Sequence, residues 1–148
     1  MLLNTWKYMN MENKFNISIV TFTNNVTDLQ LCLDSIDRQG ALTEIILIDN
    51  LGSPIVKKFL DTKPAIKYYS LSNPGFGSGH NFATSKFQTS GYRIFLNPDI
   101  ILDRNCLLAI EKCFHENPEI VMLSPQLLNR DGTKQNFVRN YPSILNLF

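Results

Sequence analysis

Three short polar segments carry the side chains of this 148-residue chain that are best suited to binding a ligand. They are VTFTNN (residues 20–25), IDN (48–50) and LNPD (96–99). Carboxylates such as Asp49 and Asp99 accept hydrogen bonds, and hard divalent cations prefer oxygen ligands. A fourth segment, NPGFGSGHN (73–81), has glycines that allow a ligand to approach the backbone. It leads into a predicted helix, whose free N–H groups favour an anion.

The segments follow short apolar runs that read as buried strands. These runs cover residues 16–22, 44–49, 66–71 and 92–96 and are rich in branched and aromatic side chains. Helices are predicted between them. Thr27 and Gln30 form a capping box for the first, which stops at Gly40, and Ser53 with Pro54 starts the second. A third, weaker helix runs from the glycine-rich segment to about residue 87.

This alternation of strands and helices predicts an α/β fold with a mostly parallel central sheet covered on both faces. In such folds ligands bind at the carboxyl ends of the strands, where the polar segments fall. Farther along the chain, Asp103 is expected to cap a helix that runs to about residue 115. Residues 120–123 resemble a further strand, and Asp131-Gly132 suggests a hairpin turn.

Composition narrows the functional class. A net charge of +1 with scattered basic residues argues against nucleic acid as a partner. The three cysteines lack disulfide or metal spacing and suggest reduced thiols in the cytoplasm. No apolar run reaches the ~20 residues that span a bilayer. Residues 1–14 are read as an N-terminal extension that could precede the true start, and residues 15–148 as one domain.

The order and spacing of the four segments resemble those of family 2 glycosyltransferases, especially the rhamnosyltransferase-like enzymes of bacterial surface polysaccharide assembly, such as those for O-antigen or capsule. The resemblance covers roughly residues 16–143, including SPQLLNRDG and VRNYPS. Each segment alone is a weak signal, but four in register are fairly specific. The resemblance implies a GT-A type, Rossmann-like three-layer sandwich that forms the N-terminal, nucleotide-sugar-binding portion of such an enzyme.

The resemblance also implies roles for individual residues. It places Thr21, Thr23 and Asp49 around the base and ribose of a dTDP- or UDP-sugar. It assigns Asp99 to a Mg²⁺ or Mn²⁺ ion that bridges the two phosphates of the donor and eases departure of the nucleoside diphosphate. The full expected set of donor-binding residues is Thr21, Phe22, Thr23, Asp49, Gly79, His80, Asn81 and Asn97.

Structural alternatives stay open for several of these residues. Asp49 can merely shape the turn before Ser53, and Asn97 with Pro98 can merely end a strand. Asn97 also stands where an Asp-x-Asp motif has its first acid, so metal binding is expected to be weak without the donor's phosphates. His80 can donate to a phosphate, but a lone histidine is more often structural. Asn81 can equally anchor the loop. Arg139 can approach a diphosphate.

The general base for transfer to a saccharide or lipid-linked acceptor is expected beyond Phe148, in the acceptor half that the resemblance implies. The chain alone is therefore expected to transfer little sugar. An alternative is a non-catalytic nucleotide-sugar-binding fragment that pairs with a second chain, for example through the apolar ILNLF end. Association with the inner face of the membrane is a further expectation. A nucleotidyltransferase is disfavoured, because VTFTNN lacks a glycine- and lysine-rich loop.

Overall fold

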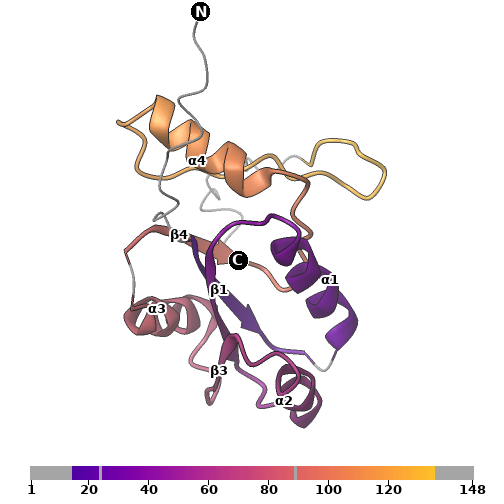
Figure 1. Ribbon diagram of the computed structural model, residues 1–148. Coiled ribbons are helices and arrows are strands. Elements are labelled where there is room, and N and C mark those ends of the chain that lie inside the picture. Colours follow the sequence, from indigo (N-terminus) through magenta and orange to yellow (C-terminus); the bar gives the residue numbers. More distant parts are fainter. Residues whose placement is uncertain (1–14, 24, 89, 136–148) are drawn as a thin grey trace, which may run out of the picture. The chain divides into compact units, whose positions relative to one another are not determined.

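The first of two compact units in the chain, residues 1–108, contains a four-stranded parallel sheet. The computed structural model describes residues 15–23, 25–88 and 90–135 (Figure 1). The strands are β1 (Phe15–Thr21), β2 (Thr43–Asp49), β3 (Ile66–Ser70) and β4 (Tyr92–Leu96), in the spatial order β3-β2-β1-β4. All three strand pairings are parallel, which confirms the predicted α/β fold.

Helices cover both faces of the sheet. Figure 1 shows α1 (Val26–Asp37) and α2 (Pro54–Leu60) on one face and α3 (Phe76–Lys86) on the other. The apolar stripe predicted for the first helix is buried at Leu29, Cys32, Leu33 and Ile36. The two central strands, β1 and β2, are buried along almost their whole length. The sheet therefore holds the carboxyl ends of β1, β2 and β4 on a rigid, close-packed base.

Helix α1 begins one residue earlier than its predicted cap. Asn25, in extended conformation, caps the helix and accepts a hydrogen bond from the Thr27 backbone N–H at 2.9 Å. The predicted capping box of Thr27 and Gln30 is therefore wrong, because the Gln30 side chain bonds to Asp34 instead. The predicted cap of the second helix is confirmed: Ser53 caps α2 and Pro54 is its first residue.

Helix α3 begins inside the glycine-rich segment rather than after it. Gly75, at φ +97°, is the N-cap, so residues 76–81 form the first turns of the helix. Gly79 faces the sheet, where an added Cβ would lie only 2.9 Å from Val20 Cγ2. This glycine therefore permits a close helix–sheet approach, and the helix and strand would have to separate to admit any side chain.

The second unit, residues 109–148, is described up to residue 135. Helix α4 (Cys106–Glu116) starts in the first unit and ends in the second. The strand predicted at residues 120–123 is wrong: the segment has no regular structure, and the Val121 and Met122 side chains are exposed. An apolar run needs a partner strand to stay in a sheet, and none of the described strands pairs with it.

The predicted turn at Asp131-Gly132 is present, with Gly132 at φ +82°. It joins a single antiparallel bridge between Leu128 and Lys134, rather than two full strands. In the described part of the chain, no helix is long and apolar enough to cross a bilayer. The N-terminal extension, Arg139 and the ILNLF end lie outside the described residues.

Candidate functional site

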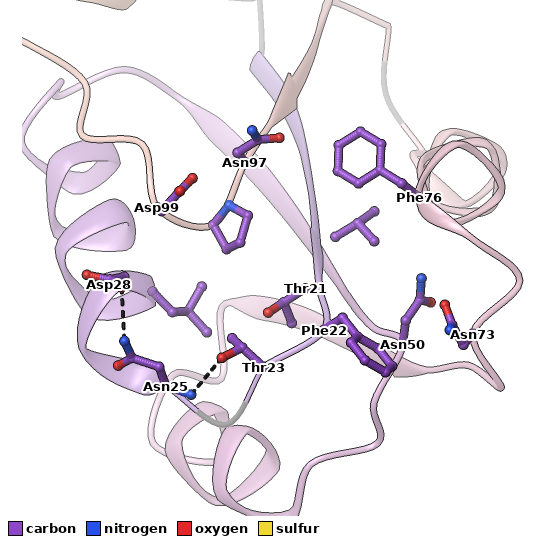
Figure 2. Close-up of a pocket in the computed structure, with 13 residues that line it drawn as sticks. Thr21, Phe22, Thr23, Asn25, Asp28, Asn50, Asn73, Phe76, Asn97 and Asp99 are labelled. Carbon is purple, nitrogen blue, oxygen red and sulfur yellow. Dashed lines mark hydrogen bonds between the residues drawn. The ribbon is translucent and has the colours of Figure 1, made fainter. Parts of the chain in front are cut away.

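A cavity of about 570 Å³ opens at the carboxyl ends of β1, β2 and β4. Figure 2 shows the 13 residues that line it. They come from the ends of these strands, from the first turn of α1 and from the start of α3. The lining residues are Val20, Thr21, Phe22, Thr23, Asn25, Asp28, Leu29, Asn50, Asn73, Phe76, Asn97, Pro98 and Asp99.

Five residues expected from the sequence line this cavity: Thr21, Phe22, Thr23, Asn97 and Asp99. Four others do not, namely Asp49, Gly79, His80 and Asn81. Asn25, Asn50, Asn73 and Phe76 were not expected, although each lies inside a segment singled out for its sequence. Asp28 lies outside all four segments. Its position in the first turn of a helix that follows VTFTNN was the only signal that could have identified it.

Asp49 organises the turn that follows β2. Its side chain is fully buried, and Oδ1 accepts the backbone N–H groups of Leu51 and Gly52 at 2.9 and 3.0 Å. Oδ2 accepts the Ser53 N–H at 2.8 Å and the Tyr68 hydroxyl at 3.0 Å. Four donors thus occupy the carboxylate. This geometry matches the structural alternative, in which Asp49 shapes the turn before Ser53.

Two buried polar atoms of the cavity have no hydrogen-bond partner among the described residues. They are Thr21 Oγ1 and Asn50 Oδ1, on side chains that are 1% and 6% exposed. Asn50 Nδ2 donates to the Gly75 carbonyl oxygen at 3.3 Å, so its free Oδ1 is an acceptor. The Thr21 hydroxyl can both donate and accept. Since an unpaired buried polar group costs about 1–3 kcal/mol, such atoms mark a place where a ligand can supply the partner.

Aromatic rings stand beside these atoms. Phe22 and Phe76 line the cavity and are 61% and 54% exposed, so their rings are accessible to a ligand. Asn73, also in the lining, has a φ of +50°, in the left-handed region that is uncommon for residues other than glycine. Exposed rings with adjacent hydrogen-bonding groups suit a flat, polar ligand that stacks on an aromatic face.

The charge of the cavity is negative. Asp28 and Asp99 are its only charged side chains, and none of the 13 lining residues is Lys, Arg or His. Burial, and secondarily the negative charge of Asp99, raise the pKa of the Cys32 thiol to about 12. No described group of three or more His, Cys, Asp or Glu residues can hold a metal by itself. The oxygen-rich lining nevertheless suits a hard cation that a ligand helps to coordinate.

His80 lies in the first turns of α3 and packs outside the cavity lining. Its side chain is 5% exposed, and Nδ1 lies 2.6 Å from the buried Ser18 hydroxyl. The Phe76 and Phe95 rings lie nearly perpendicular to the imidazole, with centroids 4.5 and 5.2 Å from it, and Nε2 has no partner among the described residues. Burial lowers the pKa of His80, so the folded chain takes up a proton at this imidazole less readily than the unfolded chain does. Asn81, beside it, is exposed.

We predict that the free energy of unfolding decreases as the pH falls below the ordinary histidine pKa of about 6.5. Below this pH, His80 is protonated in the unfolded chain, whereas its lowered pKa keeps it less protonated in the folded chain. The unfolded state then binds more protons, so a fall in pH favours unfolding. His80→Gln, which cannot titrate, should flatten this dependence. Urea titrations between pH 5 and 8 would measure it, and equal slopes for both proteins would contradict the prediction.

Comparison with protein-family models and with curated proteins gives no match to this sequence.

Proposed function

We propose that this cavity binds the nucleoside diphosphate of a nucleotide-sugar, and that the chain is the donor-binding portion of a family 2 glycosyltransferase of the GT-A type. The proposal rests on two side-chain oxygens, Thr21 Oγ1 and Asn50 Oδ1. Both atoms are buried and unpartnered among the described residues, and both side chains line one cavity at the carboxyl edge of a parallel sheet.

A nucleoside supplies what these groups lack. The edge of a nucleobase and the ribose diol each present a hydrogen-bond donor and an acceptor side by side. Phe22 offers an exposed ring for the base, and stacking of a base on an aromatic ring contributes about 1–3 kcal/mol. The Asp49 carboxylate already accepts four hydrogen bonds. We therefore propose that its neighbour Asn50, rather than Asp49, forms the hydrogen bond to the base or ribose.

The negative charge of the cavity affects binding of the donor's diphosphate. A diphosphate would be repelled by Asp28 and Asp99, since no lining residue carries a positive charge. A Mg²⁺ or Mn²⁺ ion held by Asp99 would offset this repulsion and, when bound, would stabilise the charge on the departing diphosphate. Asn97 stands at the same edge as a neutral oxygen ligand.

The proposed reaction is transfer of a sugar from a dTDP- or UDP-sugar to a saccharide or lipid-linked acceptor in bacterial surface polysaccharide synthesis. We propose a cytoplasmic enzyme that can associate peripherally with the membrane. One observation favours the alternative of a non-catalytic binding fragment. The only carboxylates that line the described cavity are Asp28 and Asp99; Asp99 is assigned to the proposed cation, and Asp28 accepts a hydrogen bond from Asn25, so neither is free to act as base for the acceptor hydroxyl.

The test is a Thr21→Val variant, which removes the unpartnered hydroxyl and keeps the shape of the side chain. We predict that UDP or dTDP raises the melting temperature of the native chain more than ADP does. In the variant the affinity should fall about fivefold, because an ordinary hydrogen bond contributes about 1 kcal/mol. The stability of the free variant should be unchanged or slightly higher, since a buried unpaired group has been removed.

Thr84→Val is the matched control. Thr84 is half-buried on α3, and its hydroxyl donates to the His80 carbonyl oxygen at 2.9 Å, away from the cavity. This change should lower stability slightly and leave nucleotide binding unaltered. If ADP, UDP and dTDP raised the melting temperature equally, or if none of them raised it, the result would argue against the proposed function.

A further inference from the structure

His80 is a buried histidine that lies next to the cavity without lining it. Its Nδ1 atom is 2.6 Å from the hydroxyl of Ser18, whose side chain is fully buried on β1. Its Nε2 atom is also buried and has no hydrogen-bond partner among the described residues. One ring nitrogen therefore fixes the imidazole to the sheet, and the other has no described group that could stabilise an added proton.

The turn of α3 that carries His80 also forms part of the cavity wall. Phe76 precedes His80 by four residues, so the two side chains lie on one face of the helix. The Phe76 ring lines the cavity, and its centroid is 4.5 Å from that of the imidazole. Gly79 packs against Val20, another lining residue, so closely that an added Cβ would lie 2.9 Å from Val20 Cγ2. A displacement of His80 would therefore move the wall of the cavity.

The surroundings of His80 offer little to balance a positive charge. Ser18 and Phe95 are paired neighbours on β1 and β4, and alternate residues of each strand share a face of the sheet. The charged and titratable side chains on this face and on α3, among the described residues, are Glu44, Lys67, Tyr69, Lys86 and Arg93. Glu44, the one carboxylate of this set, pairs with Lys67 at 2.6 Å. The other three contact the rings of Phe82 or Phe87.

Protonation would place a charge in this packed position. A buried charge without a partner is strongly unfavourable, and burial accordingly lowers the pKa of His80. The imidazolium becomes more stable if it moves toward water. Phe76 and Phe95 pack against the imidazole and are themselves exposed, so a ring that moves toward solvent displaces one or both of them.

We propose that His80 is a positioning residue for the cavity: its neutral form holds the Phe76 ring in the cavity wall, and its protonation weakens the binding of a ligand there. The inference rests on the proposed function, because the ligand that tests it is the nucleoside of the proposed donor. A purely structural histidine would affect stability but would not make the affinity of the folded chain depend on pH.

The experiment is calorimetric titration of the whole chain with uridine at pH 7.5 and pH 5.5. Uridine is the probe because it has no phosphate, so that neither a metal nor a titrating phosphate contributes. We expect the affinity of the native chain to fall by about fivefold at the lower pH, at the lower end of ordinary coupling between two sites. His80→Asn cannot titrate and keeps a polar group near the position of Nδ1, so its affinity should be equal at both pH values.

His115→Asn is the matched control. It removes the other of the two histidines in the sequence, which is exposed on α4, and should leave the fall in affinity unchanged. Asp28 and Asp99 also titrate, but they are present in all three proteins, so the difference between native chain and His80→Asn isolates His80. Circular dichroism at each pH would confirm that the proteins are folded.

A second measurement needs no variant. If protonation of His80 weakens binding, bound uridine must lower the pKa of His80 by the logarithm of the same factor. The imidazole proton signals in nuclear magnetic resonance spectra would measure this pKa with and without uridine. Equal affinity of the native chain at both pH values, an equal fall in His80→Asn, or an unchanged His80 pKa would overturn the inference and leave the nucleoside site intact. Absence of uridine and thymidine binding at pH 7.5 would overturn the proposed function as well.

Discussion

Replacing Asp99 with Asn should abolish most of the effect of Mg²⁺ on nucleoside diphosphate binding, a loss on the order of tenfold to a hundredfold. Asp99 is exposed at the cavity and is the acidic residue of LNPD, so its charge is available to a cation. Binding of the free nucleoside should be nearly unchanged, because its proposed contacts are Thr21, Phe22 and Asn50. Calorimetric titration with and without Mg²⁺ or Mn²⁺ would measure both affinities.

Asn97→Ala provides the comparison for this variant. A neutral amide oxygen is a weaker cation ligand than a carboxylate, so the loss of metal enhancement should be smaller than for Asp99→Asn. If Asp99→Asn retains the full metal effect, LNPD is a strand-ending turn in this chain and the proposed cation site is wrong.

Replacing Asp49 with Ala should lower the free energy of unfolding by roughly 3–5 kcal/mol. The change removes the acceptor of three backbone N–H groups and of the Tyr68 hydroxyl from a fully buried position. Urea denaturation followed by circular dichroism would measure it. In Asp49→Asn the Tyr68 pKa, raised to about 12 by burial and by the hydrogen bond and charge of Asp49, should also fall.

Asp61→Asn is the control variant, because it removes a carboxylate charge from an exposed position rather than from a buried one. Asp61 is exposed and forms an ion pair with Lys57 at 3.1 Å, so its replacement should cost less than about 1 kcal/mol. If Asp49→Ala instead folds with native stability and fails only to bind nucleotide, the carboxylate recognises the ligand after all. The turn would then hold without it.

The fold was largely predictable because its signals are local. Alternating apolar runs and helix periodicity identified all four strands of the sheet, and Ser53-Pro54 marked the start of α2. The errors occurred where two local signals compete. Asn25 and Thr27 can both cap a helix, and only the observed backbone shows that Asn25 does so. Residues 120–123 have the composition of a strand, but strand formation depends on a partner that composition does not reveal.

The segments that line the cavity could be predicted from the sequence, but the side chains that face it could not. Alternate residues of a strand point to opposite faces, and a shift of one residue at its end exchanges a buried group for one in the cavity. IDN therefore lies at the edge of the sheet where the cavity opens, but Asp49 accepts backbone N–H groups of the turn and Asn50 lines the cavity. Asp28 was missed because it approaches the site through the packing of α1 against the segment after β4.

The turn after β2 has a consequence for how the protein can change over evolutionary time. Asp49 is constrained by folding, since its carboxylate organises three successive backbone N–H groups. Its neighbour Asn50 makes one side-chain hydrogen bond, at 3.3 Å to the Gly75 carbonyl oxygen, and its Oδ1 is free of described partners. Under the proposed function, substitutions at position 50 would alter which ligand is accepted while the turn held by Asp49 stays in place, so that selection on specificity and selection on foldedness would act on adjacent but separate residues.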